Sequence, residues 1–300
     1  MKYLIVATSY DENSGGVIAL HKLCHVINSL GGEAYLHPRV TEFRAGFKSL
    51  LRAAKSFLRV NFGKYKTNPS FNTPVKRRVT KRELEDFCVV YPENISGNPV
   101  GGRRVVRWFL HHPGYHSGQV NYFSGELYFS YDSFGRDFTI HGSKTSDWPL
   151  HITHFFDEYY NDVGTDKVRT GVAYCLRKGK GRDMVHDVDH SILIDGLSHR
   201  EVASIFRRSD IFVSYDLYTA YSWFAIMCGC VPVIIPQEGL GVEEWYPNAQ
   251  SRLGLSYGFD HVEQARAEME LAKRNLKNKE TETVDNVKRF LSEVENYFSD

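Results

Sequence analysis

The sequence predicts an α/β protein made of two Rossmann-like domains that face each other across a cleft. Short apolar runs rich in β-branched residues alternate with segments of helical periodicity, the pattern of parallel sheets covered by helices. The 300 residues, 42% of them hydrophobic, suffice for two cores of ordinary size. Glycines and polar residues follow the apolar runs, at the strand ends where such sheets place their ligands.

The change of domain is expected in a stretch of weak periodicity that precedes the apolar run 171–176. The first domain is therefore expected to cover residues 1–166 and the second residues 167–282. Two charged helices are expected at the end of the chain, at 261–278 and 283–298, and residues 283–300 form the closing segment.

The bulk composition argues against several classes of protein. A formal net charge of +1 disfavours a dedicated nucleic-acid binder. The first ten residues turn polar too soon for a signal peptide, and no run of about 18 apolar residues exists to span a bilayer. Five scattered cysteines, an odd number, indicate reduced thiols. We expect a cytosolic protein, and peripheral attachment to the inner face of a membrane stays open.

The first domain opens with a strand, a polar turn and a helix. Residues 3–8 are apolar, the following turn ends in Gly15 and Gly16, and residues 17–30 have helical periodicity. The glycine pair lets the backbone approach a ligand, or it forms a tight turn that needs positive φ. Further strands of this domain are expected at 34–36, 87–91, 105–110 and 127–131.

Residues 44–82 hold twelve lysines or arginines and no acidic residue. Five of these cations fall on one face of an expected amphipathic helix: Arg44, Lys48, Arg52, Lys55 and Arg59. Such a helix can lie in an anionic membrane interface, where each cation contributes about 1 kcal/mol. The alternative is an ordinary surface helix whose apolar face lies in the core.

Three histidines follow the expected strand 105–110. His111, His112 and His116 stand at a strand end, where active-site residues belong. No carboxylate or thiol accompanies them at ligand spacing, so the sequence disfavours a zinc site. A general base, or a hydrogen-bonding partner of a substrate, is favoured instead.

The second domain is expected to begin with the strand 171–176. Four cations interleaved with glycines follow in the segment 177–182, RKGKGR. Glycines let backbone N–H groups approach a ligand and the cations neutralise charge, so this turn suits a diphosphate. Arg177, Lys178 and Lys180 are the candidates, and a simple solvated basic turn is the alternative.

Residues 211–235 give the clearest pattern in the chain. The strands 211–215 and 231–235 flank a helix that ends at Gly229. Three hydroxyl-bearing residues cluster where this helix begins: Thr219, Tyr221 and Ser222. The backbone N–H groups and the positive end of the dipole at a helix start favour a phosphate.

Residues 224–229, FAIMCG, and residues 231–233, VPV, resemble the donor-binding half of GT-B glycosyltransferases. The pattern formed by Arg107, Trp108, Pro113 and Gly114 resembles bacterial polysaccharide glycosyltransferases. The resemblance implies transfer of a sugar from a nucleotide-sugar donor to a glycan or lipid-linked acceptor. It implies that the second domain binds the donor and the first the acceptor. It also implies that the closing helix packs back on the first domain. Because fixed cations and amides at a helix start can stabilise the departing diphosphate, no metal ion or other cofactor is expected.

The resemblance further assigns individual residues. Two glutamates that hold the donor sugar and the ribose in retaining members correspond to Asp216 and Phe224, and a phenylalanine cannot hydrogen-bond a ribose hydroxyl. Glu238, in the loop after the strand that follows, is a candidate replacement. Four loop residues are also implied to face the donor: Gly15 and Gly16 from the first domain, and Asp195 and Gly196 after the strand 191–194.

Two mechanisms stay open. If the anomeric centre inverts, a base from the first domain must deprotonate the acceptor, and the candidates by position are Asp11, His21 and His112. If the configuration is retained, no such base is required, and Asp216 keeps the carboxylate of the first glutamate position.

Three other functions remain as alternatives, and one of them is a nucleic-acid binder that uses the basic run 44–82. A nucleotide-sugar epimerase or hydrolase would draw on the histidines of the segment 111–116. A degenerate, non-catalytic module that binds nucleotide sugar or glycan would account for Phe224. Release of free nucleotide from the donor separates a competent enzyme from a binding module.

Overall fold

The computed structural model of the protein describes residues 1–38, 63–115, 118–131, 137–165 and 168–299. Six of the residues singled out above lie outside these ranges: Arg44, Lys48, Arg52, Lys55, Arg59 and His116.

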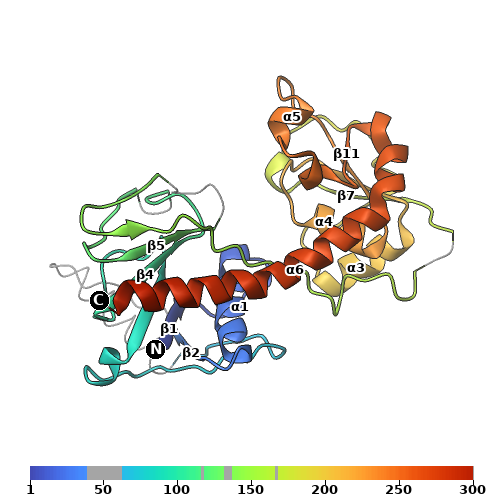
Figure 1. Cartoon of the computed structure of the whole chain (residues 1–300). Coiled ribbons are helices and arrows are strands. Elements are labelled where there is room, and N and C mark those ends of the chain that lie inside the picture. The colour runs from blue at the N-terminus through green and yellow to red at the C-terminus, as the bar shows by residue number, and fades with distance from the viewer. Residues whose placement is uncertain (39–62, 116–117, 132–136, 166–167, 300) are drawn as a thin grey trace. The chain divides into compact units, whose positions relative to one another are not determined.

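The chain forms two compact units (Figure 1). Unit 1 comprises Met1–His154 and Glu280–Asp300, and unit 2 comprises Phe155–Lys279. The units thus divide after His154 and after Lys279, whereas the sequence pattern places the changes after residues 166 and 282.

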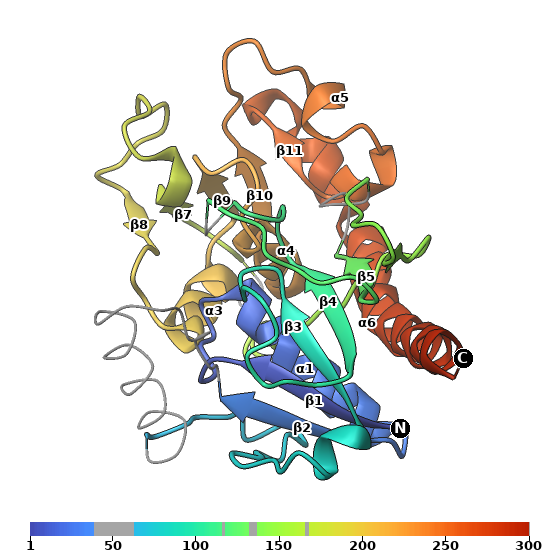
Figure 2. The ribbon, with the colours of Figure 1, turned by 90° about the vertical axis from the view of Figure 1, so that its left-hand side faces the viewer.

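Unit 1 contains a parallel sheet of six strands in the order β2-β1-β3-β4-β5-β6 (Figure 2). Its strands are β1 (Lys2–Ala7), β2 (Glu33–Pro38), β3 (Phe87–Pro92), β4 (Arg104–Phe109), β5 (Leu127–Ser130) and β6 (Lys144–Thr145). The helix α1 (Gly15–Ser29) joins β1 to β2, and a 3-10 helix, η1 (Glu83–Glu85), precedes β3. The strands expected from the sequence are confirmed, and the two-residue β6 is an addition.

Both faces of this sheet are buried, which explains the unbroken apolar runs in its strands. Ile5 on β1 belongs to a core cluster that includes residues of α1 and, from the closing helix, Phe290. Leu4, its neighbour in the strand, points to the opposite face and belongs to a second cluster with Leu84 of η1.

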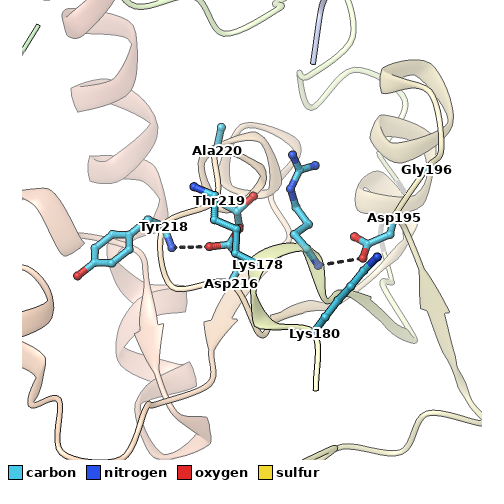
Figure 3. A pocket seen from close by; sticks show the side chains of 9 residues that line it. Lys178, Lys180, Asp195, Gly196, Asp216, Tyr218, Thr219 and Ala220 are labelled. Carbon is cyan, nitrogen blue, oxygen red and sulfur yellow. Dashed lines mark hydrogen bonds between the residues drawn. The ribbon is translucent and has the colours of Figure 1, made fainter. Parts of the chain in front are cut away.

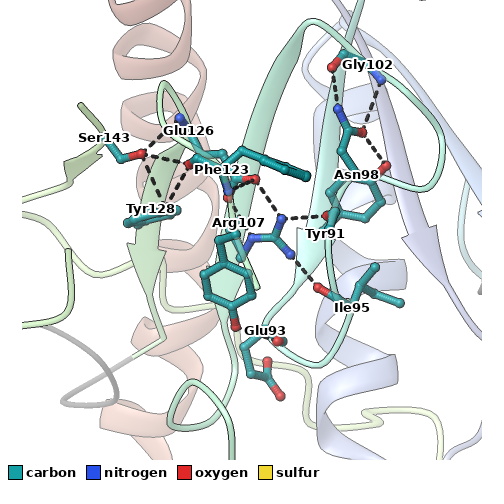
Figure 4. A network of polar contacts seen from close by, with 12 residues as sticks. Tyr91, Glu93, Ile95, Asn98, Gly102, Arg107, Phe123, Glu126, Tyr128 and Ser143 are labelled. Atoms are coloured by element: carbon teal, nitrogen blue, oxygen red, sulfur yellow. Dashed lines mark hydrogen bonds and ion pairs between the residues drawn. The ribbon is translucent and has the colours of Figure 1, made fainter. Parts of the chain in front are cut away.

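An ion pair is buried inside unit 1. Arg107, on β4, has no exposed surface and donates to both carboxylate oxygens of Glu126, with N···O distances of 2.8 Å. It also donates to the backbone carbonyls of Ile95 and Gly97, at 2.6 and 2.9 Å. Its guanidinium lies 3.9 Å from the centre of the Tyr122 ring. Figure 4 shows Arg107 at the centre of this network. The carboxylate and the carbonyl oxygens together compensate the buried positive charge of the Arg107 guanidinium.

Unit 2 contains a second parallel sheet, of five strands in the order β11-β10-β9-β7-β8. Its strands are β7 (Val172–Cys175), β8 (Ser191–Leu193), β9 (Ile211–Ser214), β10 (Val231–Ile234) and β11 (Ser256–Tyr257). Its helices are α3 (His199–Arg208), α4 (Tyr221–Cys228), α5 (Val242–Trp245) and the first part of α6 (Val262–Phe298). Its 3-10 turns are η2 (Arg177–Gly179), η3 (Ala249–Arg252) and η4 (Phe259–His261).

The ends of two helices in unit 2 follow from the sequence. Ser198 and Glu201 form a reciprocal capping box at the start of α3, in which the Ser198 N–H donates to the Glu201 carboxylate at 2.9 Å. Gly229 ends α4 in the left-handed conformation, with φ of 77°, which favours glycine. The predicted strand–helix–strand unit around α4 is confirmed.

The two sheets have the same strand order. Counted from its own first strand, each runs 2-1-3-4-5, and unit 1 adds a sixth strand at the edge. In each sheet the order reverses between the first strand and the third, that is between β1 and β3 and between β7 and β9. Doubly wound sheets bind ligands outside the carboxyl ends of the strands at this switch point.

A single helix, α6 (Val262–Phe298), closes the chain, so the prediction of two helices was wrong. The residues between the two expected segments, 279–282, contain no glycine or proline, and lysine and glutamate are good helix formers. The last turns of α6 pack in the core of unit 1 through Val287, Phe290 and Val294. None of the helices in the described ranges, α6 included, is long and apolar enough to cross a membrane.

All five cysteines are buried and none is in a disulfide: Cys24, Cys88, Cys175, Cys228 and Cys230. Burial raises the pKa of Cys24, Cys175 and Cys228 to about 12. At neutral pH these thiols stay protonated and pack as small apolar groups.

Candidate functional site

A pocket of about 440 Å³ opens at the carboxyl ends of β7, β8 and β9 in unit 2 (Figure 3). It lies at the switch point between β7 and β9. Nine residues line it: Arg177, Lys178, Lys180, Asp195, Gly196, Asp216, Tyr218, Thr219 and Ala220. The sequence predicts all of these as site residues except Tyr218 and Ala220. They come from three separate loops.

The first loop leaves β7 through a strained residue. Arg177 has φ of 43°, a left-handed conformation that costs a non-glycine residue roughly 1–2 kcal/mol. Asp195 stabilises this turn, because its Oδ2 accepts the backbone N–H groups of Leu176 at 3.1 Å and Arg177 at 3.0 Å. The Arg177 guanidinium then lies 4.9 Å from the centre of the Tyr221 ring. Strain that neighbouring groups hold in place is characteristic of ligand-binding turns.

A glycine is required one step further along this loop. A Cβ atom at Gly179 would lie 2.1 Å from the backbone oxygen of Tyr215, so no other residue fits without a shift of the backbone. The close approach brings Lys178 and Lys180, on either side of the glycine, to the pocket. Within the described part of the chain, Lys178, Lys180 and Arg177 form no ion pair.

The second side of the pocket is the turn between β9 and α4. Asp216 is buried, and its Oδ1 accepts the backbone N–H of Tyr218 at 3.1 Å. The Thr219 hydroxyl accepts the N–H of Tyr221 at 3.3 Å. The backbone N–H groups of Thr219 and Ala220 have no acceptor among the described residues. Because they stand at the start of α4, they offer two donors to an anion at the positive end of the helix dipole.

Two of the hydroxyl residues expected at the pocket are buried and do not line it. Tyr221 and Ser222, the first residues of α4, are 7% and 4% exposed. Burial raises the pKa of Tyr221, and the charge of the nearby Arg177 offsets part of this effect. Phe224 stacks on Tyr160 with ring centres 4.2 Å apart, so the position of the second family glutamate is a core position in this chain.

The three candidate bases of unit 1 differ in exposure. Asp11 is exposed in the loop after β1, where its Oδ1 accepts the N–H of Asn13 at 3.0 Å. His112 is exposed after the end of β4. His21, on α1, has no exposed surface; its Nε2 lies 3.0 Å from the Thr8 carbonyl oxygen, and burial lowers its pKa.

Three further candidates for the donor site do not line the pocket of unit 2. Gly15 and Gly16 are the first residues of α1 and belong to unit 1. Glu238 is exposed in the loop after β10.

Two side chains of the site were not singled out in the sequence. Tyr218 lines the pocket and is 54% exposed, and its hydroxyl donates to the Trp245 carbonyl oxygen at 3.3 Å. Arg182 ties the strand ends together, because it donates to the carbonyl oxygens of Tyr215 at 2.8 Å and Ile235 at 3.1 Å. Arg182 is the last residue of the basic turn RKGKGR, and that position was the signal that could have found it.

The pocket combines groups suited to a ligand with an anionic part and a polar part. Arg177, Lys178 and Lys180 supply positive charge, and the start of α4 supplies N–H donors. Two carboxylates provide acceptors; Oδ1 of Asp195 is buried and has no hydrogen-bond donor among the described residues. Asp216 is the other carboxylate of the lining. The described residues contain no group of three or more His, Cys, Asp or Glu side chains arranged to hold a metal ion.

Fold and pocket define an α/β protein with two doubly wound sheets and a cationic pocket at the switch point of the second. No protein-family model and no curated protein sequence matches the chain.

Solved structures resemble the chain at low sequence identity. Sucrose-phosphate synthase from Thermosynechococcus elongatus has 10% identity and a TM-score of 0.47, over 100% of each chain. T4 phage BGT in complex with its UDP-glucose substrate has 8% identity and a TM-score of 0.39, over 99% of this chain and 97% of that one. Acinetobacter baumannii MurG has 9% identity and a TM-score of 0.36, over 96% and 100%.

Proposed function

We propose that this protein is a metal-independent glycosyltransferase that moves a sugar from a nucleotide-sugar donor to a glycan or lipid-linked acceptor. One observation carries the proposal: the cationic turn after β7 and the start of α4 converge on one pocket at a switch point. These are the two segments whose residues predict a phosphate or diphosphate site, in the domain to which the resemblance to GT-B enzymes assigns the donor. For a lipid-linked acceptor, the proposal includes attachment to an anionic membrane through the five cations of residues 44–59.

In this proposal the pocket stabilises the leaving group. The bond between the anomeric carbon and the diphosphate oxygen breaks, and its electron pair leaves with the diphosphate. Lys178 and Lys180 provide fixed positive charge for the growing negative charge, and the N–H groups at the start of α4 provide hydrogen bonds. The acceptor hydroxyl forms the new bond to the anomeric carbon and gives up its proton. Because these donors are already in place, little reorganisation is needed as charge develops.

The proton acceptor depends on the stereochemical course. For inversion, a base from unit 1 removes the proton from the acceptor hydroxyl; Asp11 and His112 are exposed and qualify, whereas His21 is buried against the Thr8 carbonyl. For retention, Asp216 is the carboxylate of the donor pocket that keeps the family position.

The experiment is a thermal-shift screen with UDP, GDP, CMP and dTDP sugars, because a ligand that binds the folded state raises its stability. With the donor so identified, Lys178→Ala is expected to weaken its affinity at least tenfold, about 1.4 kcal/mol. Without ligand, the free energy of unfolding of this variant should differ from that of the parent by less than about 0.5 kcal/mol, because Lys178 is exposed. Lys277→Ala is the control: it removes an exposed lysine of unit 2 on α6, outside the pocket.

Equal donor affinity in the Lys178 and Lys277 variants would remove the assigned site. Failure of every nucleotide sugar to stabilise the protein would argue against the function itself.

A second candidate function, a non-catalytic module that binds nucleotide sugar, is favoured by the core position of Phe224. Slow release of free nucleotide from the bound donor supports the transferase. Tight binding with no release over many hours supports the module.

A further inference from the structure

A second groove, of about 780 Å³, lies in unit 1 where the last turns of α6 pass the loop after β6. Figure 1 shows this end of α6 beside the strands of unit 1. Eight residues line the groove: Lys144, Asp147, Trp148, Arg289, Ser292, Glu293, Asn296 and Tyr297. The proposed transfer reaction uses none of them.

One wall of the groove is a single stripe of α6. Its residues recur with the spacing i, i+3, i+4, i+7 and i+8, from Arg289 to Tyr297. A different side of the same turns is held in the core of unit 1 through Phe290 and Val294. The packing of α6 in the core therefore fixes the direction in which these groove residues point. A site built on a packed helix is more rigid than one built on loops.

The facing wall holds a tryptophan at the surface. Trp148 is 60% exposed, and the Arg289 guanidinium lies 5.2 Å from its ring centre. The Trp148 backbone N–H donates to the Ser146 hydroxyl at 3.1 Å, and this hydroxyl donates to Oε2 of Glu293 at 2.6 Å. Ser146, itself buried, thereby fixes the tryptophan backbone and the Glu293 carboxylate relative to each other.

The charges of the lining exclude some ligands. Lys144 and Arg289 are balanced by Asp147 and Glu293, so the groove carries no excess charge for a phosphate or another ion. What remains is an exposed aromatic surface surrounded by carboxylate, amide, hydroxyl and guanidinium groups. A sugar ring has the matching features, because its C–H face packs against an electron-rich ring and its hydroxyls both donate and accept hydrogen bonds.

We propose that this groove binds a neutral oligosaccharide, with one sugar ring on Trp148 and hydroxyls hydrogen-bonded by Glu293 and Asn296. The stripe from Arg289 to Tyr297 follows about 12 Å of the helix axis, which is longer than one sugar ring and suits a short chain. The inference rests on the proposed function in one respect, that the protein handles glycans. It assigns the glycan chain a binding site in unit 1, in addition to the donor pocket in unit 2.

The test is isothermal titration calorimetry of the full chain with tetra- to hexasaccharides of the cello-, malto-, xylo- and chito- series. One series is expected to bind, and Trp148→Ala is expected to lower its affinity at least tenfold. Trp148→Phe, which keeps an aromatic face, should lose less. Phe123→Ala is the matched control, because Phe123 is 50% exposed in the same unit and lies outside the groove. Urea denaturation of each variant confirms that the fold is retained.

Absence of binding in all four series, or equal affinity in the Trp148→Ala and Phe123→Ala variants, would overturn the proposal. A third outcome would also overturn it. If the parent protein sediments as a dimer and the Trp148→Ala variant sediments as a monomer, the groove is a contact between two copies of the chain. The donor pocket is tested separately: Trp148→Ala should keep nucleotide-sugar binding. If the parent protein binds oligosaccharide but no nucleotide sugar, the transferase proposal fails, and the proposal that this groove binds an oligosaccharide is retained.

Discussion

The two sheets share a strand order and differ at the point where that order reverses. In unit 2, three cations and the start of α4 line an accessible pocket at this point. In unit 1, two side chains near the ends of the corresponding strands are buried, one on α1 and one in the loop after β3. His21 contacts the Thr8 carbonyl after β1, and Glu93, after β3, accepts the N–H of Leu110 at 3.1 Å. Strand order thus provides the same place for a ligand in both sheets, and the side chains near that place differ in burial and charge.

Two arginines, one in each unit, show the same difference in burial and pairing. Arg107 in unit 1 is buried and paired with Glu126 through two hydrogen bonds. Arg177 in unit 2 is exposed, has a strained backbone and forms no ion pair with the described carboxylates. The first arginine is expected to serve stability, and the second to serve ligand binding at a small cost in stability.

The largest expected effect is on stability. Arg107→Ala should lower the free energy of unfolding by about 3–5 kcal/mol, because it leaves the Glu126 carboxylate buried without its partner. Urea denaturation measures the loss. Arg103→Ala, which removes an exposed arginine of the same unit, should change stability by less than about 0.5 kcal/mol. Similar stabilities of the two variants would show that the buried pair is no more important than a surface charge.

A smaller effect is expected at Arg177. Glycine adopts the left-handed conformation without strain, so Arg177→Gly should be more stable than Arg177→Ala by roughly 1 kcal/mol. Both variants should weaken binding of the donor, because both remove the guanidinium. The comparison uses urea denaturation and donor titration. An alanine variant as stable as the glycine variant would mean that this turn relaxes without cost.

The smallest expected effect depends on pH. Burial lowers the pKa of His21, so the folded protein holds this ring neutral, whereas the ring in the unfolded chain takes up a proton below about pH 6.5. Protons then favour the unfolded state, and stability is lost as the pH falls below that value. His21→Gln keeps a donor for the Thr8 carbonyl and does not titrate. The Tm should therefore fall less steeply from about pH 7.5 to 5.5 in this variant, and parallel curves would contradict the assignment.

The convergence of the pocket residues could be predicted from local patterns. The apolar runs mark the strands, and the segments after residues 176, 194 and 215 carry the basic turn, Asp195 and Thr219. Because parallel strands place their carboxyl ends at the same edge of a sheet, loops far apart in the sequence meet there. The helix end at Gly229 and the capping box of α3 were equally local signals.

Other features depend on contacts that no local pattern reports. The left-handed conformation of Arg177 had no glycine to signal it and depends on Asp195, which is on another loop. The pairing of Arg107 with Glu126 joins a residue of β4 to the residue that precedes β5. The burial of Tyr221 depends on which side of α4 faces the core, and the first turn of that helix is apolar on too many sides to show it.

The buried thiols determine how the protein can be labelled. Maleimides react with the thiolate form, and burial raises the pKa of every cysteine in the chain. The five native cysteines should thus be silent toward such reagents in the folded protein. A cysteine introduced at an exposed position such as Lys277 can then carry a single fluorophore while every native cysteine stays in place. The same five thiols become reactive when the core opens, so the rate of their modification reports local unfolding in either unit.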